Sequence, residues 1–295
     1  MPKRSFWLEF LILWGAGTSA ILLQSFFIGN LTVPANGPLS RQYHPAVWLP
    51  RNFGVAGLIF GLAIAVGFGL FAARRVGLGA PIIEKKLRGE LIGSDLRAMI
   101  FPSLLVGVLI AGLWSLPRFP VAHYDKDTSN RIQEQLEHSS AMKKLEEESP
   151  SVPITRTEGF VLSAASAIDS ELILRLFGLS LMVWLLARLA GTPGGAASLN
   201  ILRLSVLAFA VGLALYDLYG AWSDNRWLRN LLIGVQIPED PLWVTAARVF
   251  IRSIPTSLLL GWLYVRRGIE STILAALAGN LLHEFLVLYV LYRFF

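Results

Sequence analysis

An apolar stretch at residues 160–189 carries three ionisable side chains, Asp169, Glu171 and Arg175. A charged group in hydrocarbon is costly unless it is paired or reaches water, so each of these residues needs an explanation. Glu171 and Arg175 are four residues apart, which places them on one face of a helix. The spacing permits an acid–base pair that moves protons, and equally an internal ion pair that neutralises both charges in lipid.

A second polar group lies in the last apolar stretch, at residues 269–294, which holds Asn280, His283 and Glu284. Asn280 precedes His283 by three residues and Glu284 by four, so we expect one polar stripe that faces neighbouring helices. An imidazole beside a carboxylate can act as a base or a ligand. The same groups can also serve as hydrogen bonds between helices.

Long apolar segments must position both groups. Apolar residues make up 54% of the 295 residues and charged residues only 16%, and the mean hydropathy is +0.57. Such a composition suits lipid rather than a soluble core. Runs long enough to cross a bilayer lie at residues 5–28, 53–73, 99–116, 160–189, 199–220, 242–265 and 269–294. We predict an all-α, polytopic transmembrane helical bundle with about seven spans.

The basic residues predict the orientation of the chain. If seven spans alternate, one side receives Lys3, Arg4, Arg74, Arg75, Lys85, Lys86, Arg88, Arg97, Arg188, Arg203, Arg266 and Arg267. An excess of Lys and Arg marks the cytoplasmic side. We therefore expect a cytoplasmic N-terminus and an outer C-terminus, in a bacterial cytoplasmic membrane. The net charge of +6 then reflects topology, so the lipid bilayer, and no nucleic acid, is the expected partner.

The sequence divides into three regions. Residues 1–116 contain three predicted transmembrane helices, and residues 117–158 are polar and predict an extracytoplasmic loop with one amphipathic or solvated helix. Residues 159–295 contain four further spans and all the polar groups described above. The chain has no cysteine, which excludes disulfides, Cys-ligated metals and a thiol nucleophile.

Three segments of the last region resemble the CPBP (ABI) intramembrane endopeptidases, the family that includes the type II CAAX prenyl endopeptidases. Residues 167–177 (AIDSELILRLF) are similar to the E-E-x-x-x-R motif of that family, and residues 207–215 lie where it has F-x-x-x-H. Residues 261–280 (GWLYVRRGIE, then ILAALAGN) resemble its closing G-W/Y-L-Y-x-R-x-G run and the H-x-x-x-N/D helix. The resemblance implies a helical bundle around a polar cavity. There a Glu activates water, and His and Asn groups bind metal or stabilise an oxyanion.

The chain departs from these motifs at three positions. The first motif Glu is Ser170, and the third motif's His is Ala276. The second motif's His is Leu215, or Leu213 if Phe209 is the motif Phe. The motif residues that remain are Glu171, Arg175 and Asn280.

Three interpretations follow. A degenerate site predicts a scaffold that binds membrane peptides or a partner membrane protein without cleaving them, with no cofactor. A rearranged site of Asp169, Glu171, Asn280 and the substitute His283 predicts an active intramembrane endopeptidase, and only then a divalent metal such as zinc. A transporter or channel component would show internal repeats or broken paired helices, and the sequence shows neither clearly.

Overall fold

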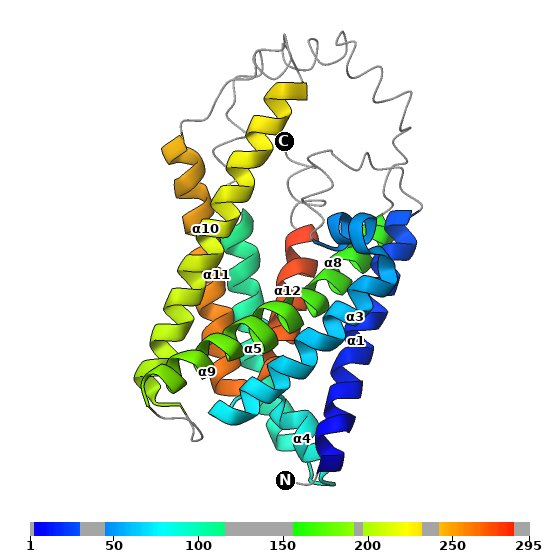
Figure 1. Ribbon diagram of the computed structural model, residues 1–295, viewed down its shortest axis with the longest axis vertical. Coiled ribbons are helices and arrows are strands. Elements are labelled where there is room, and N and C mark those ends of the chain that lie inside the picture. The colour runs from blue at the N-terminus through cyan, green and yellow to red at the C-terminus, as the bar shows by residue number, and fades with distance from the viewer. Residues whose placement is uncertain (1–2, 30–44, 116–155, 192–196, 232–241, 286–295) are drawn as a thin grey trace.

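The computed structural model describes residues 3–29, 45–115, 156–191, 197–231 and 242–285, and within these ranges every regular element is helical (Figure 1). The elements are α1 (Lys3–Gly29), α3 (Pro45–Val76), α4 (Pro81–Leu87), α5 (Gly93–Ser115), α8 (Arg156–Glu171), the π-helix η3 (Leu172–Leu179), α9 (Ser180–Leu189), α10 (Leu199–Leu231), α11 (Leu242–Arg267) and α12 (Ile269–Phe285). Among the described residues, a helix lies in each of the predicted apolar stretches. Most of the predicted outer loop at 117–158 lies outside the described residues.

Five of these segments are long and apolar enough to cross a membrane: Ser5–Phe26, Gly54–Val76, Gly93–Ser115, Gly159–Leu189 and Leu199–Gly220. Large apolar side chains cover their outer surfaces; Phe101, for example, is 74% exposed. A water-soluble surface does not present so many large apolar groups, whereas lipid solvates them. The chain is therefore an integral membrane protein.

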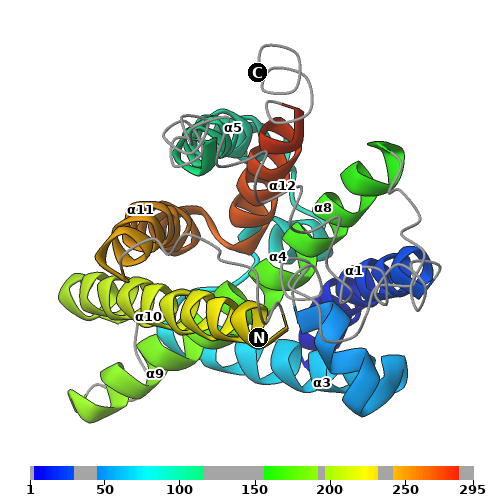
Figure 2. The ribbon, with the colours of Figure 1, turned by 90° about the horizontal axis from the view of Figure 1, so that it is seen from above.

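Helices α11 and α12 lie at the sixth and seventh predicted spans but are not among the five. Helix α11 is 26 residues long, and its four arginines lower its hydropathy. Helix α12 is described over 17 residues only. Both pack within the bundle, α11 against α10 and α12 against α5 and α8 (Figure 2).

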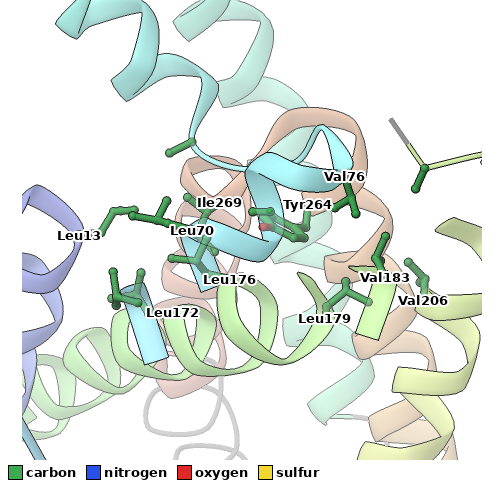
Figure 3. Packing of buried hydrophobic residues seen from close by; sticks show 14 of the residues in the cluster. Leu13, Leu70, Val76, Leu172, Leu176, Leu179, Val183, Val206, Tyr264 and Ile269 are labelled. Carbon is green, nitrogen blue, oxygen red and sulfur yellow. The ribbon is translucent and has the colours of Figure 1, made fainter. Parts of the chain in front are cut away.

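The N-terminal helices share their core with the C-terminal ones. Helix α1 packs on α3 and α8, α3 packs on η3 and α9, and α5 packs on α12. The largest apolar cluster (Figure 3) draws buried residues from α1, α3, η3, α9, α10, α11 and α12: Leu13, Leu70, Val76, Leu172, Leu176, Leu179, Val183, Val206, Tyr264 and Ile269. The regions 1–116 and 159–295 are thus divisions of the sequence, and the described parts of both build one bundle.

Glycines permit two of the closest helix contacts. A Cβ added at Gly69 on α3 would lie 2.7 Å from the backbone oxygen of Leu176 in η3. A Cβ added at Gly107 on α5 would lie 2.9 Å from the backbone oxygen of Ala275 on α12. Helices in membranes gain much of their stability from such backbone approaches, because apolar side chains gain little by leaving lipid for protein.

The short helix α4 is tied to the end of α12. Oε1 of Glu270 accepts hydrogen bonds from the backbone N–H groups of Ile82 and Ile83, at 2.9 and 3.0 Å. The backbone N–H of Ile269 donates to the oxygen of Gly79 at 3.0 Å. In Figure 1, α4 lies at the end of the bundle where α3 ends and α12 begins. One carboxylate oxygen therefore accepts hydrogen bonds from two of the N–H groups that have no partner within the first turn of α4.

Replacing Glu270 with alanine is expected to loosen α4. The two amide groups lose their acceptor, which costs about 1–3 kcal/mol, and local opening becomes more frequent. Hydrogen exchange of residues 81–88, followed by mass spectrometry on the purified protein, should quicken. The control is Glu90→Ala, which removes only an exposed ion pair with Arg88. Equal exchange in wild type and Glu270→Ala would refute the anchoring role.

Candidate functional site

Glu171 and Arg175 form a buried ion pair where α8 passes into η3. Nε of Arg175 lies 3.6 Å from Oε2 of Glu171, and both side chains are almost fully buried. The guanidinium carbon also lies 5.5 Å from the ring centroid of Phe209 on α10. The side chain of Thr272 on α12 approaches the Glu171 carboxylate, while its hydroxyl donates to the backbone oxygen of Ile269 at 2.8 Å. The pair predicted from the four-residue spacing is confirmed, and three helices enclose it.

The helix that carries Arg175 is widened. The backbone N–H of Ser180 donates to the oxygen of Arg175, five residues earlier, which is the hydrogen-bond pattern of a π-helix. The Ser180 hydroxyl lies 2.6 Å from the hydroxyl of Tyr264 on α11. Long π-helical segments are rare and often occur at functional sites. This one begins directly after Glu171, so it sets the direction in which Arg175 points.

Asn280 does not join this pair. Its Nδ2 donates to the backbone oxygen of Ser163 at 3.0 Å, while Thr272, on the same helix α12, faces Glu171. Glu171 comes eight residues after Ser163 on α8, whereas its neighbour Thr272 comes eight residues before Asn280 on α12. The two helices therefore run antiparallel. At 1.5 Å per residue, Asn280 lies about 12 Å along the helix from the level of Glu171. One small substrate group therefore cannot touch both side chains.

Asp169 faces a different neighbour. Its Oδ2 accepts a hydrogen bond of 2.9 Å from Nε2 of Gln24 on α1, and both side chains are buried. Asp169 is two positions from Glu171, a rotation of about 200° around α8, which explains why the two carboxylates meet different helices. Nothing in the spacing of the chain marks Gln24 as the partner of Asp169, because it lies 145 residues away.

His283 belongs to a separate cluster between α5 and α12. Its Nδ1 lies 3.3 Å from Oγ of Ser115, and its ring packs edge-on against Trp114 with centroids 5.7 Å apart. The Ser115 hydroxyl also donates to the backbone oxygen of Ala111 at 2.8 Å. The direction of the hydrogen bond between Ser115 and His283 depends on which ring nitrogen carries the proton. Ser115 and His283 thus join α5 and α12 through one side-chain hydrogen bond.

The polar stripe predicted on the last helix divides between two neighbours. Asn280 contacts α8 and His283 contacts α5. Three residues rotate a helix by about 300°, which leaves the two side chains roughly 60° apart. In a bundle this angle is enough to direct them to different helices. The side chain of Glu284 lies outside the described residues.

The three altered motif positions also point in different directions. Ser170 on α8 bonds to the backbone oxygen of Ser166 in its own helix. Ala276 is buried on α12, whereas Leu215 on α10 is 54% exposed and faces away from the bundle. Leu213, the alternative position, is half-buried.

Two further findings bear on this site, one on metal binding and one on similarity to known proteins. Within the ranges that the structure describes, no three His, Asp or Glu side chains are grouped so that they could hold a metal ion. Comparisons of the chain with protein-family models, with curated proteins and with solved structures find no match.

Proposed function

We propose that this chain is a seven-span membrane protein with a CPBP-like core of four C-terminal helices and a degenerate peptidase site. It binds membrane peptides or a partner membrane protein within the bilayer and does not cleave them. Helices α11 and α12 supply the sixth and seventh spans. The helix ends rich in Lys and Arg face the cytoplasm, so the N-terminus is cytoplasmic and the C-terminus lies outside.

One observation carries the degenerate-site proposal: the candidate polar residues have separate partners, either within one helix or across different helix pairs. Glu171 pairs with Arg175, and Asn280 binds the backbone of α8. His283 contacts α5, and Asp169 contacts α1. Hydrolysis of an amide needs a base and an electrophile at one reacting carbonyl. These four contacts distribute the candidates over separate places in the bundle.

The family resemblance gains one geometric argument. If Phe209 is the aromatic residue of the second motif, the two motifs lie side by side, because its ring packs over Arg175 of the first motif at 5.5 Å. This register makes Leu213 the position of the missing His. A half-buried Leu213 fits an inward motif position better than the outward-facing Leu215.

The active-peptidase alternative also has an observation in its favour. Oε2 of Glu171 and Nε and Nη1 of Arg175 are buried and have no hydrogen-bond partner. Buried polar atoms normally have one, so the polar backbone of a bound peptide could use them. Nothing in the described residues favours a transporter or channel component.

A cleavage assay separates the two proposals. We expect purified wild-type protein in lipid vesicles to leave a panel of transmembrane and prenylated peptides intact, with or without added zinc. Glu171→Ala and His283→Ala should give the same result, since neither residue acts on substrate. The products are followed by mass spectrometry over hours.

The control for folding is the double variant Glu171→Gln/Arg175→Met, which removes both charges together. Cleavage by wild type that is lost in His283→Ala, or in this double variant while it remains folded, would establish an active enzyme. Such a result would overturn the degenerate-site proposal. Retention of a panel peptide by uncleaved protein in the same vesicles would support the binding role.

A further inference from the structure

Three helices share a pattern near their C-terminal ends, in which an aromatic residue is followed four positions later by arginine. The pairs are Phe71 and Arg75 on α3, Trp184 and Arg188 on α9, and Trp262 and Arg266 on α11. In each pair the guanidinium lies over the ring, at 5.2, 5.6 and 5.9 Å from the centroid. Figure 1 shows that these three helices end at the same end of the bundle.

Two of the pairs join into one patch. The rings of Phe71 and Trp184 meet edge-on with centroids 6.2 Å apart. Phe71, Trp184, Arg75 and Arg188 thus form a continuous arginine–aromatic patch across α3 and α9. Both arginines are exposed. The pair on α11 has no such second pair attached to it in the described residues.

The charge of this patch is not neutralised by the described residues. Some basic side chains at this end have acidic partners: Arg74 pairs with Glu9 and Glu84, and Lys85 pairs with Asp95. Neither Arg75 nor Arg188 has a carboxylate within ion-pair distance in the described part of the chain. Two guanidinium groups therefore remain available to an anion from outside the protein.

The place of the patch indicates which anion. It lies where the lipid-facing surface ends, beside exposed apolar side chains such as Phe68 (61% exposed) and Leu189 (82% exposed). Aromatic residues at helix ends lie at the depth of the lipid headgroups. Guanidinium groups are weakly hydrated and bind phosphate with two parallel hydrogen bonds. We propose that the arginine–aromatic patch binds the phosphate of an anionic phospholipid whose acyl chains lie along the apolar side chains next to it.

An anionic lipid suits the patch better than a zwitterionic one. The ammonium group of phosphatidylcholine would bring a positive charge toward two guanidinium groups, whereas phosphatidylglycerol brings none. The proposal requires only that the chain is embedded in a membrane. It is therefore independent of whether the polar core is a degenerate or an active site.

Lipid titration of the detergent-purified full chain tests the assignment. Phosphatidylglycerol added to the micelles should raise the unfolding temperature of wild type, and phosphatidylcholine should do so far less. In Arg75→Gln/Arg188→Gln, the apparent affinity for phosphatidylglycerol should fall roughly tenfold or more, since each basic residue near a headgroup contributes to binding. Arg266→Gln, the matched control with the same local geometry but a single pair, should bind within about twofold of wild type.

Three outcomes would overturn the proposal. They are unchanged lipid affinity in the double variant, an equal loss in Arg266→Gln, and equal stabilisation by inorganic phosphate without lipid. If the double glutamine variant does not fold, Arg75→Lys/Arg188→Lys replaces it. This variant keeps the charge but loses the planar fork, so it should show weakened selectivity for phosphatidylglycerol. Wild-type selectivity in the lysine variant would exclude phosphate recognition by the guanidinium groups.

Discussion

Replacing Glu171 with glutamine should destabilise the protein more than replacing its partner Arg175 with methionine. The two side chains are buried in contact with each other, with Nε and Oε2 3.6 Å apart. Glu171→Gln leaves a guanidinium inside the bundle without a counter-charge. An arginine cannot escape this cost by losing its proton, so we expect a loss of about 3–5 kcal/mol, the range for a broken buried ion pair.

The reverse substitution has a way to relieve the charge. In Arg175→Met, the Glu171 carboxylate can take up a proton and become a neutral acid that Thr272 still contacts. The remaining cost is about 1–3 kcal/mol for an incompletely hydrogen-bonded group. The double variant Glu171→Gln/Arg175→Met carries no buried charge, and it should recover most of the stability lost by Glu171→Gln.

Reversible unfolding in mixed micelles, measured for all four proteins, gives the coupling energy of the pair. An apolar-to-apolar change at a nearby buried position, Leu176→Met, controls for altered packing, because it conserves volume. Equal losses in the two single variants, or strictly additive losses in the double variant, would show that the residues do not act as an ion pair. If the pair is confirmed, Glu171→Ala also leaves Arg175 without a counter-charge and destabilises the fold. The cleavage assay then relies on the double variant Glu171→Gln/Arg175→Met, which carries no buried charge.

The spacing of residues predicted those parts of the structure that depend on one helix at a time. The apolar runs gave the positions of the helices, because twenty apolar residues suit lipid wherever they occur. The interval between Glu171 and Arg175 gave their contact, because side chains four apart on a helix are neighbours. Neither inference needed any knowledge of which helices meet.

The partners of the other polar residues could not be predicted in this way. Gln24 meets Asp169 only because α1 packs on α8, and Asn280 finds a backbone oxygen whose identity depends on the register of α12 against α8. The sequence also gave no indication of η3, since a π-helix uses the same residue types as an α-helix. These features depend on which helices pack together and how closely. Glycines and other small residues allow a close approach, but they do not determine which helix makes it.

The π-helix η3 should depend on Gly69. The backbone oxygen of Leu176 and the Cα of Phe177 would lie 2.7 and 3.0 Å from a Cβ at this position. These are backbone atoms, so a rotamer change cannot make room and α3 must move away from η3. We expect Gly69→Ala to cost about 2–3 kcal/mol or more, as overpacking of a tight contact does.

Gly61→Ala supplies the matched control on the same helix, because a Cβ at Gly61 meets nothing within 4 Å. Alanine favours a helix over glycine, so this change should be neutral or stabilising by up to about 1 kcal/mol. The two substitutions add the same methyl group to α3 and should change the free energy of unfolding with opposite signs. Equal effects would mean that the close approach of α3 to η3 does not hold in the membrane.

Combining Gly69→Ala with the charge variants links the packing to the polar core. If the approach of α3 fixes the widened turn, then moving α3 also shifts Arg175, which lies in η3 one residue before Leu176. The coupling energy between Glu171 and Arg175 should then fall in the Gly69→Ala background and persist in the Gly61→Ala background. A coupling energy that Gly69→Ala leaves unchanged would show that η3 holds its shape without α3. In that case the contact with Phe209 and the hydrogen bond between Ser180 and Tyr264 would be sufficient to position the buried arginine.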